Sequence, residues 1–183
     1  EILLVGSGGK LEKILRDNCI CKVVSIDIDP SRYPDIVCDI SDTAFSDSSF
    51  DTIIALEVFE HIKFPDRAIK EIYRLLKPKG SLLLSVPFMF PIHDEPFDFQ
   101  RWTLQGVRLL TYKFKNVQIL NKHNEVISIL VIISRLFFSS KNLVLRILGA
   151  IFILLGGILP LRFFLHSKQY SRISTGYLIS AKK

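Results

Sequence analysis

The chain has 183 residues, 49% of them hydrophobic, which is enough for one domain with a sizeable core and argues against disorder. Its net charge of +6 is concentrated in residues 121–183, which contain nine Lys or Arg and one acid, whereas the first 120 residues are slightly acidic. Because this basic segment is also the most apolar one, it does not suit phosphate groups, and we expect no nucleic-acid partner.

Strands and helices alternate along the first half of the chain, as they do in a parallel sheet with right-handed crossovers. Short apolar runs predict strands, the spacing of Leu11, Ile14 and Leu15 predicts a helix over 10–17, and a Ser- and Asp-rich stretch over 41–49 predicts a loop. The predicted strands lie at 2–5, 22–27, 36–39 and 50–56. We therefore expect an α/β, doubly wound, Rossmann-like sheet that binds its ligand at the carboxyl ends of the strands.

The next segment predicts a helix over 65–76, which begins near Pro65 and ends at a turn over 77–80. A strand at 81–86 follows, and then a long loop over 87–102. Thr103 suits the N-cap of a helix that runs to residue 112. The pattern ends with strands at 114–120 and 174–181.

A glycine turn follows the first strand. Gly6 and Gly8 let the backbone approach a ligand closely, whereas Leu11 stands where a dinucleotide fingerprint needs a glycine. Asp27 ends the second strand about 20 residues further on, a spacing that suits hydrogen bonds to ribose hydroxyls, although an Asp that only caps a turn would look alike. Asp39 ends the third strand, where it suits either an adenine amino group or a simple turn.

Residues 50–62 and 68–80 together carry a Phe-Asp start to an apolar strand, a Glu-His pair, and a helix that ends in a Leu-Lys-Pro-Lys-Gly turn. This combination resembles class I S-adenosylmethionine-dependent methyltransferases of the "type 11" kind. The resemblance implies a seven-stranded, mostly parallel sheet with an antiparallel last strand and S-adenosylmethionine as cofactor. It also implies a set of cofactor-binding residues, namely Gly6, Ser7, Gly8, Asp27, Ile28, Asp39, Ile40, Leu56 and Glu57.

Within that set the resemblance gives the glycine turn to the methionine part of the cofactor, Asp27 to the ribose and Asp39 to the adenine end. The chain departs from the family pattern at Leu4, where an acid is usual, and at Lys10, where a third glycine is usual. These departures motivate an alternative, in which a degenerate methyltransferase fold serves as a non-catalytic nucleoside-binding or membrane-docking module.

The loop over 87–103 follows a strand on the ligand side of the sheet and combines one histidine, three acids, one arginine and several aromatic residues. His93 is the natural candidate for a general base, because histidine as a residue type suits proton transfer near neutral pH, and either Asp94 or Asp98 could orient it. The other interpretation is a structural loop in which Asp98 pairs with Arg101. With His61, these four residues form the predicted substrate side of the site.

Similar stretches occur in methyltransferases of bacterial cell-surface glycan and lipid pathways. The resemblance therefore implies O- or N-methylation of a small-molecule or lipid- or glycan-linked acceptor. The predicted division of the chain is a cofactor-binding core over 1–120, a hydrophobic basic helical insertion over 121–172 and a final core strand over 173–183.

The insertion contains two apolar runs. Residues 126–138 hold one charge, Arg135, and residues 147–161 hold none, which is short of the roughly 20 residues that a spanning helix needs. The insertion could be a lid over the substrate, a homodimer interface, extra core helices or a membrane-surface anchor. We favour the anchor, on an anionic membrane, with basic side chains reaching the head groups: Arg135, Lys141, Arg146 and Arg162.

The three cysteines, Cys19, Cys21 and Cys38, are too few for a disulfide framework, and we expect them to be small buried hydrophobic residues in a reducing cytosol. A Cys-x-Cys pair does not supply the four ligands that zinc normally needs, so no metal site is expected. We expect a cytoplasmic protein, peripheral on the inner face of the membrane if the anchor is real. The chain begins inside a strand pattern and its one methionine is Met89, so we expect a stretch to precede it.

Overall fold

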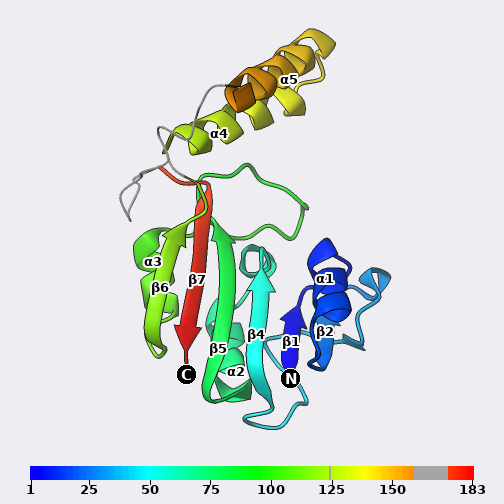
Figure 1. Ribbon diagram of the computed structural model, residues 1–183, viewed down its shortest axis with the longest axis vertical. Coiled ribbons are helices and arrows are strands. Elements are labelled where there is room, and N and C mark those ends of the chain that lie inside the picture. The colour runs from blue at the N-terminus through cyan, green and yellow to red at the C-terminus, as the bar shows by residue number, and fades with distance from the viewer. Residues whose placement is uncertain (124, 159–172) are drawn as a thin grey trace.

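The protein, seen in a computed structural model that describes residues 1–123, 125–158 and 173–183, is built on one seven-stranded sheet with the strand order β3-β2-β1-β4-β5-β7-β6 (Figure 1). β7 runs antiparallel to both of its neighbours, and the other pairs are parallel. The prediction of a mostly parallel sheet with an antiparallel last strand is therefore confirmed. The strands are β1 (Ile2–Val5), β2 (Val23–Asp27), β3 (Ile36–Val37), β4 (Phe50–Leu56), β5 (Leu76–Pro87), β6 (Lys115–Asn121) and β7 (Gly176–Lys182).

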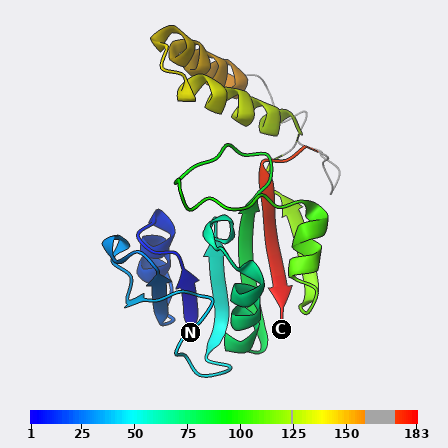
Figure 2. The same cartoon turned by 180° about the vertical axis from the view of Figure 1, so that it is seen from behind.

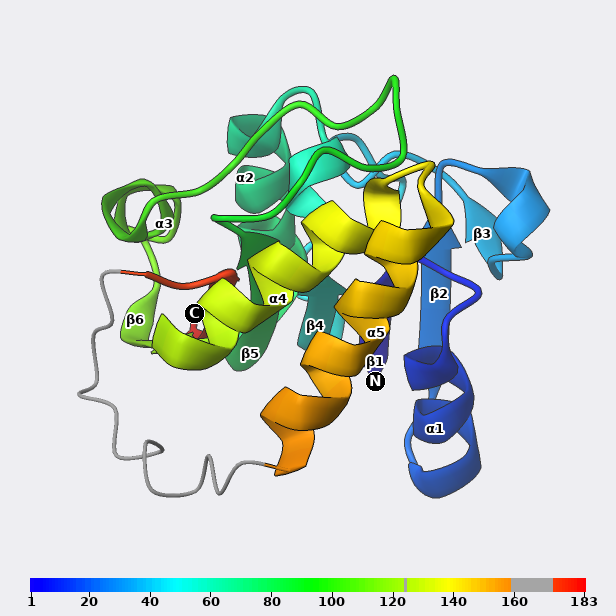
Figure 3. The ribbon, with the colours of Figure 1, turned by 90° about the horizontal axis from the view of Figure 1, so that it is seen from above.

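Helices cover both faces of the sheet, as a doubly wound fold requires. Seen from above, α2 (Pro65–Leu75) and α3 (Leu104–Leu110) lie on one face and α1 (Lys10–Asn18) lies on the other (Figure 3). The main core fills the space beneath α2 and α3, where Ile72 and Leu75 are fully buried against the strands. A smaller core cluster lies beneath α1. Thr103 caps α3 as predicted, since its hydroxyl accepts a hydrogen bond from Gly106 N at 3.0 Å.

The predicted turn at residues 77–80 is wrong. α2 ends at Leu75, β5 begins at Leu76, and the Lys-Pro-Lys-Gly stretch lies inside this strand at an irregularity of its pairing with β4. Lys79 has a left-handed backbone (φ 65°), and a Cβ on Gly80 would lie 2.8 Å from Lys77 O. A strand irregularity of this kind needs the same Pro and Gly residues as a helix-ending turn, so the sequence did not separate the two. The third strand is also shorter than predicted, ending at Val37.

Two helices lie between β6 and β7 in the chain, α4 (Glu125–Ser139) and α5 (Leu143–Ile158). They pack side by side, with Gly149 so close to Phe137 that an added Cβ would lie 2.6 Å from the Phe137 Cβ. This α4–α5 hairpin lies above the carboxyl ends of the parallel strands, which Figures 1 and 2 show from opposite sides. The rest of the predicted insertion, with Arg162 and the end of the second apolar run, lies outside the described residues. Within the described residues, no helix combines the length and the apolar character needed to cross a membrane.

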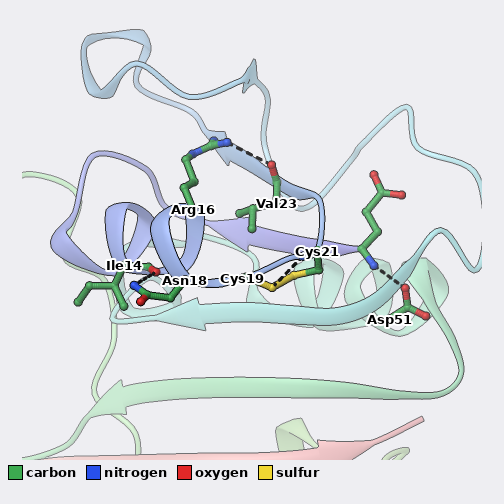
Figure 4. The surroundings of a disulfide bond; sticks show 8 residues. Ile14, Arg16, Asn18, Cys19, Cys21, Val23 and Asp51 are labelled. Carbon is green, nitrogen blue, oxygen red and sulfur yellow. Dashed lines mark hydrogen bonds and ion pairs between the residues drawn. A yellow bond between two sulfur atoms is a disulfide. The ribbon is translucent and has the colours of Figure 1, made fainter.

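The expectation of three free cysteines is wrong for two of them. Cys19 and Cys21 form a disulfide directly after α1, with their Cα atoms 5.1 Å apart (Figure 4). Both residues are half-buried, and so is Cys38, the free cysteine, whose thiol pKa is raised by burial and by the nearby Asp39. A disulfide framework is recognised by several spaced pairs of cysteines. A single bond across one intervening residue does not show that pattern, so the sequence did not indicate it.

An ion pair ties α2 to the loop before β4. The guanidinium of Arg74 binds both carboxylate oxygens of Glu71, at 2.8 and 2.6 Å, and the same carboxylate accepts hydrogen bonds from the backbone and hydroxyl of Thr43. The bond from Arg74 lowers the pKa of Glu71 to about 2, against the opposing effect of burial. The carboxylate thus stabilises the fold only while it is ionised.

We therefore expect the free energy of unfolding to fall as the pH drops from about 4.5, where an unfolded glutamate begins to take up a proton, through about 2. Since one pKa unit corresponds to about 1.4 kcal/mol, Glu71 contributes about 3 kcal/mol of stability that is present at neutral pH and lost in acid. Urea unfolding at several pH values measures this. Glu71→Gln should be less stable than the wild type at pH 7 and should lose less on acidification; equal slopes for the two proteins would contradict the assignment.

Candidate active site

The glycine turn after β1 has the conformation that the sequence predicts. Gly6 and Gly8 both have positive φ angles, 90° and 81°, which other residues adopt only with strain. An added Cβ on Gly6 would lie 2.9 Å from the Val58 side chain, and one on Gly8 would lie 3.2 Å from Arg32 O. The turn therefore depends on glycine at both positions, and it leaves bare backbone at the carboxyl end of β1.

Asp27 lies at the end of β2 and points back to this turn. Its Oδ2 accepts a hydrogen bond from Ser7 N at 2.9 Å, its Oδ1 accepts one from Asp29 N at 2.9 Å, and its side chain is only 10% exposed. A carboxylate offers about four lone-pair positions, so two remain after these bonds. The carboxylate is thus fixed in position while it keeps acceptor capacity for two neighbouring hydroxyl groups.

A second carboxylate reaches the turn from α1, and the sequence analysis missed it. Glu12 Oε2 accepts hydrogen bonds from Gly8 N and from the Ser7 hydroxyl, both at 3.0 Å. Burial acts to raise the pKa of Glu12, but the bonds from Gly8 and Arg16 outweigh it and hold the pKa below its usual value. The spacing of Glu12 behind the Gly9 N-cap, that of a capping box, could have revealed this contact.

A cation also lies at this edge. Arg32 ends the short 3-10 helix η1 (Pro30–Arg32), and its Nε lies 4.0 Å from Asp27 Oδ2 and 3.9 Å from Asp29 Oδ2. The Arg32 carbonyl accepts a hydrogen bond from the Ser7 hydroxyl at 3.1 Å. η1 therefore packs against the glycine turn, with a half-exposed arginine beside the predicted ribose ligand.

The other predicted cofactor residues differ in their surroundings. Asp39 accepts a hydrogen bond from Ser41 N at 2.7 Å, which is the simple turn that the sequence left open. Ile28 is largely exposed at the strand end, whereas Ile40 is buried in the main core. Leu56, the last residue of β4, is half-buried.

Glu57 turns away from the glycine turn and towards β5 and β6. It has a left-handed backbone, with φ 53°. Its Oε1 accepts a hydrogen bond from the Ser85 hydroxyl at 2.7 Å and forms an ion pair with Lys122. The sequence analysis did not foresee either contact, and they direct the carboxylate to the side of the sheet where the long loop lies.

The loop between β5 and α3 is held by a buried ion pair. Asp98, 1% exposed, accepts hydrogen bonds from Arg101 Nη2 at 2.6 Å and from His93 N at 2.8 Å. The bond from Arg101 lowers the pKa of Asp98 to about 2, although burial opposes this. The predicted pairing of Asp98 with Arg101 is present, and Asp98 also lies 3.4 Å from His93 Nδ1, whereas Asp94 offers its backbone carbonyl to Phe97 N.

His61 and His93 meet beneath this loop. Their rings pack edge to face with centroids 5.0 Å apart, and His61 Nδ1 lies 2.8 Å from Phe97 O. Glu60, in the 3-10 helix η2 (Phe59–His61), is fully buried, and its Oε1 lies 3.8 Å from His93 Nε2 and 3.9 Å from His61 Nε2. Burial raises the pKa of Glu60. We call Glu60, His61 and His93 the Glu-His-His cluster.

Comparison with known proteins identifies the fold and gives a family match over the first part of the chain. Residues 3–84 match the family described as "Methyltransferase domain". Among solved structures, a SAM-dependent methyltransferase from Archaeoglobus fulgidus is similar over 100% of this chain and 85% of its own, with a TM-score of 0.65 and 14% identity. One from Methanosarcina mazei is similar over 100% and 91% of the two chains, with a TM-score of 0.61 and 16% identity. No curated protein sequence matches this chain.

Residues 3–84 thus match a methyltransferase family, and the chain as a whole has the fold of S-adenosylmethionine-dependent methyltransferases. A third similar structure is phosphoethanolamine N-methyltransferase 2 from Haemonchus contortus, bound to S-adenosyl-L-methionine, with a TM-score of 0.61 and 18% identity. This chain is covered completely but spans only 48% of the Haemonchus enzyme. The predicted fold, enzyme class and cofactor are confirmed, while the residue-by-residue assignments remain predictions.

The residues at the strand ends fit the methyltransferase cofactor. The glycine turn leaves main chain uncovered where a Cβ would intrude, and Asp27 keeps lone pairs for ribose hydroxyls. Glu12 and Asp27 together place two carboxylates at the turn, which favours a cofactor that carries a sulfonium and an ammonium group. The acid that the family pattern usually has at the position of Leu4 is absent, but Glu12 places another carboxylate at the turn from α1.

Proposed function

We propose that this methyltransferase acts on an oxygen or nitrogen of a small-molecule or lipid- or glycan-linked acceptor, which binds between the glycine turn and the long loop. The Glu-His-His cluster supports this proposal most strongly, because it places ionisable groups beyond the end of β4, next to the loop that follows β5. The phosphoethanolamine methyltransferase, a protein with the same fold, acts on a small polar acceptor according to its name.

S-adenosylmethionine, when bound, supplies an electrophilic methyl group and a thioether leaving group. In our proposal Asp27 holds the ribose, Gly6 and Gly8 allow the methionyl tail to lie on the main chain, and Asp98 with Arg101 keeps the loop in place. The acceptor atom donates its lone pair to the methyl carbon while the carbon–sulfur bond breaks, and the acceptor then releases its proton to a base. His93 Nε2 has no hydrogen bond to any described residue, so it can take this proton or bind a cation instead.

Transfer of a tritiated methyl group from S-adenosylmethionine to candidate acceptors tests the activity. Amines, hydroxylated sugars and their lipid-linked forms cover the proposed class. Labelled product with one acceptor group identifies the substrate. If the chain binds S-adenosylmethionine but methylates none of these acceptors, the non-catalytic nucleoside-binding module becomes the better account.

We also propose that the α4–α5 hairpin places the enzyme on an anionic membrane. Several apolar side chains of α5 are about half exposed or more, and two exposed cations lie in the same segment, Arg146 within α5 and Lys141 just before it. Apolar side chains beside basic ones suit the interface of a bilayer that contains anionic lipids. The exposed apolar residues used here are Leu143, Val144, Ile147, Leu148 and Ile151.

We expect the protein to float with vesicles rich in phosphatidylserine and to be released by high salt, which screens the attraction between charges. The double variant Val144→Asp/Ile147→Asp should bind these vesicles at least about 100-fold more weakly, since burying each such apolar side chain is worth about 1.5–3 kcal/mol and each 1.4 kcal/mol is tenfold. Leu109→Asp, on α3 and more exposed than either residue, is the matched control and should float like the wild type. Failure of the wild type to float removes the membrane proposal, and a dimer sensitive to the double variant would favour a subunit interface.

A further inference from the structure

The carboxylate of Glu60 is buried without a hydrogen bond. Its side chain is 0% exposed, and neither oxygen has a hydrogen-bond partner among the residues that the structure describes. A buried carboxylate without partners is costly, and native proteins pair such groups with cations, donors or metal ions. The buried carboxylate of Glu60 therefore indicates that a cation or a hydrogen-bond donor binds beside it and compensates the cost of its burial.

Two imidazole nitrogens face this carboxylate. Glu60 Oε1, His61 Nε2 and His93 Nε2 all lie within 4.8 Å of one another, and the carboxylate oxygen is 3.8–3.9 Å from each nitrogen. These separations exceed a hydrogen bond but are close to the roughly 3.4 Å between neighbouring ligands of a four-coordinate ion with bonds of about 2.0–2.1 Å. A cation could thus be bound after small movements of the side chains.

The other nitrogen of each ring is already engaged. His61 Nδ1 lies 2.8 Å from the Phe97 carbonyl, and His93 Nδ1 lies 3.2 Å from the Pro91 carbonyl and 3.4 Å from Asp98 Oδ2. Such acceptors hold the proton on Nδ1 and leave the lone pair on Nε2, which is the usual arrangement around metal-binding histidines. Both lone pairs then belong to the atoms that face Glu60.

Two of the nearby cations are bound mainly by other carboxylates. Arg101 is bound by Asp98, and Lys122 pairs with Glu57. The histidine side chains are 24% and 30% exposed, so an ion can enter from the solvent although Glu60 itself is buried.

From this geometry we propose that Glu60, His61 and His93 bind one divalent transition-metal ion of the zinc class. Two imidazole nitrogens and one carboxylate oxygen form a ligand set that Zn²⁺ uses in open sites, where a further position is left for water or substrate. No metal is predicted from the sequence, where these ligands are two adjacent residues and a third in a distant loop and do not form a recognisable ligand spacing. The fold brings them together.

This inference deepens the proposed function. It rests on that function for one point, namely that the methyl acceptor is the fourth ligand of the ion. An acceptor oxygen in the open position would be held beside the cofactor, and the charge of the ion would lower the pKa of that hydroxyl. A coordinated His93 has no lone pair left on Nε2, so the metal-loaded enzyme does not use His93 as its general base. The acceptor class is then an alcohol rather than an amine.

The test measures metal binding by the full chain after dialysis against a chelator. We expect the wild type to take up one Zn²⁺ or Co²⁺ per chain, to show the visible absorption of four- or five-coordinate Co²⁺, and to melt at a higher temperature with Zn²⁺. His93→Ala, in an exposed loop, and Glu60→Gln should each bind Co²⁺ more than about 100-fold more weakly, a larger loss than second-shell partners usually cause. His123→Gln is the control, because His123 contacts Thr175 outside the cluster.

No uptake by the folded wild type, or equal uptake by Glu60→Gln and the wild type, would overturn the metal site. Calorimetry with S-adenosylmethionine on the same samples separates this failure from that of the proposed function. A protein that binds the cofactor but no metal keeps the methyltransferase proposal and loses the metal. A protein that binds metal but no cofactor keeps the metal site and loses the methyltransferase proposal.

Discussion

Asp27→Asn is expected to weaken the binding of S-adenosylmethionine and S-adenosylhomocysteine by about 10–100-fold. A hydrogen bond to a charged group contributes about 1.5–3 kcal/mol, and each 1.4 kcal/mol changes a dissociation constant tenfold. Asparagine keeps one acceptor oxygen but presents an amide donor in place of the other, so it cannot accept bonds from both Ser7 N and Asp29 N and still receive two ribose hydroxyls. Isothermal titration calorimetry measures the change directly.

Asp29→Asn is the matched control for this variant. Asp29 is the neighbouring acid, about half exposed, and its carboxylate accepts a bond from Ser31 N rather than from the glycine turn. We expect its cofactor affinity to stay within about threefold of the wild type, since asparagine caps a helix about as well as aspartate does. If both variants bind the cofactor equally well, Asp27 is not the ribose ligand.

Asp98→Asn is expected to destabilise the fold by about 2–3 kcal/mol and to abolish most of the activity. The substitution removes the charge that binds Arg101 and weakens the bond from His93 N, and a buried ion pair that loses one partner typically costs about 3–5 kcal/mol. Arg101 is about a quarter exposed, so water compensates part of this cost. At about 2–4 °C per kcal/mol the melting temperature should fall by about 5–10 °C.

Asp94→Asn, in the same loop, is the control. It shows whether any loss of an acid in this loop destabilises the protein, or only the loss of the Asp98–Arg101 ion pair. Asp94 offers its backbone carbonyl to Phe97 N, and this bond does not need the carboxylate. Its melting temperature should stay within about 1 °C of the wild type. Thermal unfolding of the three proteins, with activity measured on the same samples, shows whether Asp98 has the role given to it; equal melting temperatures would contradict it.

The sequence was a good guide wherever local residue preferences and tertiary packing agree. The apolar runs of β1 and β4, the helix behind Pro65 and the Thr103 cap lie within a residue or two of their predicted places. Asp27 was correctly placed at the glycine turn, because the length of the intervening helix fixes where the next parallel strand ends. The prediction of a turn over 77–80 was wrong, because the same residues suit both a turn and an irregular strand.

The side-chain contacts of the site were much harder to predict. Glu12 and Arg32 lie close in sequence to the glycine turn, yet their contacts depend on how α1 and η1 pack, which no local pattern reports. Glu60 looked like part of a family motif, and only the fold shows that it is buried against His93, more than 30 residues away. Ionisable groups from different strand ends meet only when the whole sheet has formed.

An adenosine moiety is expected to bind where β1 and β2 end, with its ribose held by Asp27. A crystal structure of the protein grown with millimolar S-adenosylhomocysteine tests it most directly. We expect electron density for the ligand with both ribose hydroxyls within about 3 Å of the Asp27 carboxylate and the homocysteine tail along residues 6–8. A ligand bound elsewhere, or a glycine turn that remains empty at saturating ligand, would contradict it.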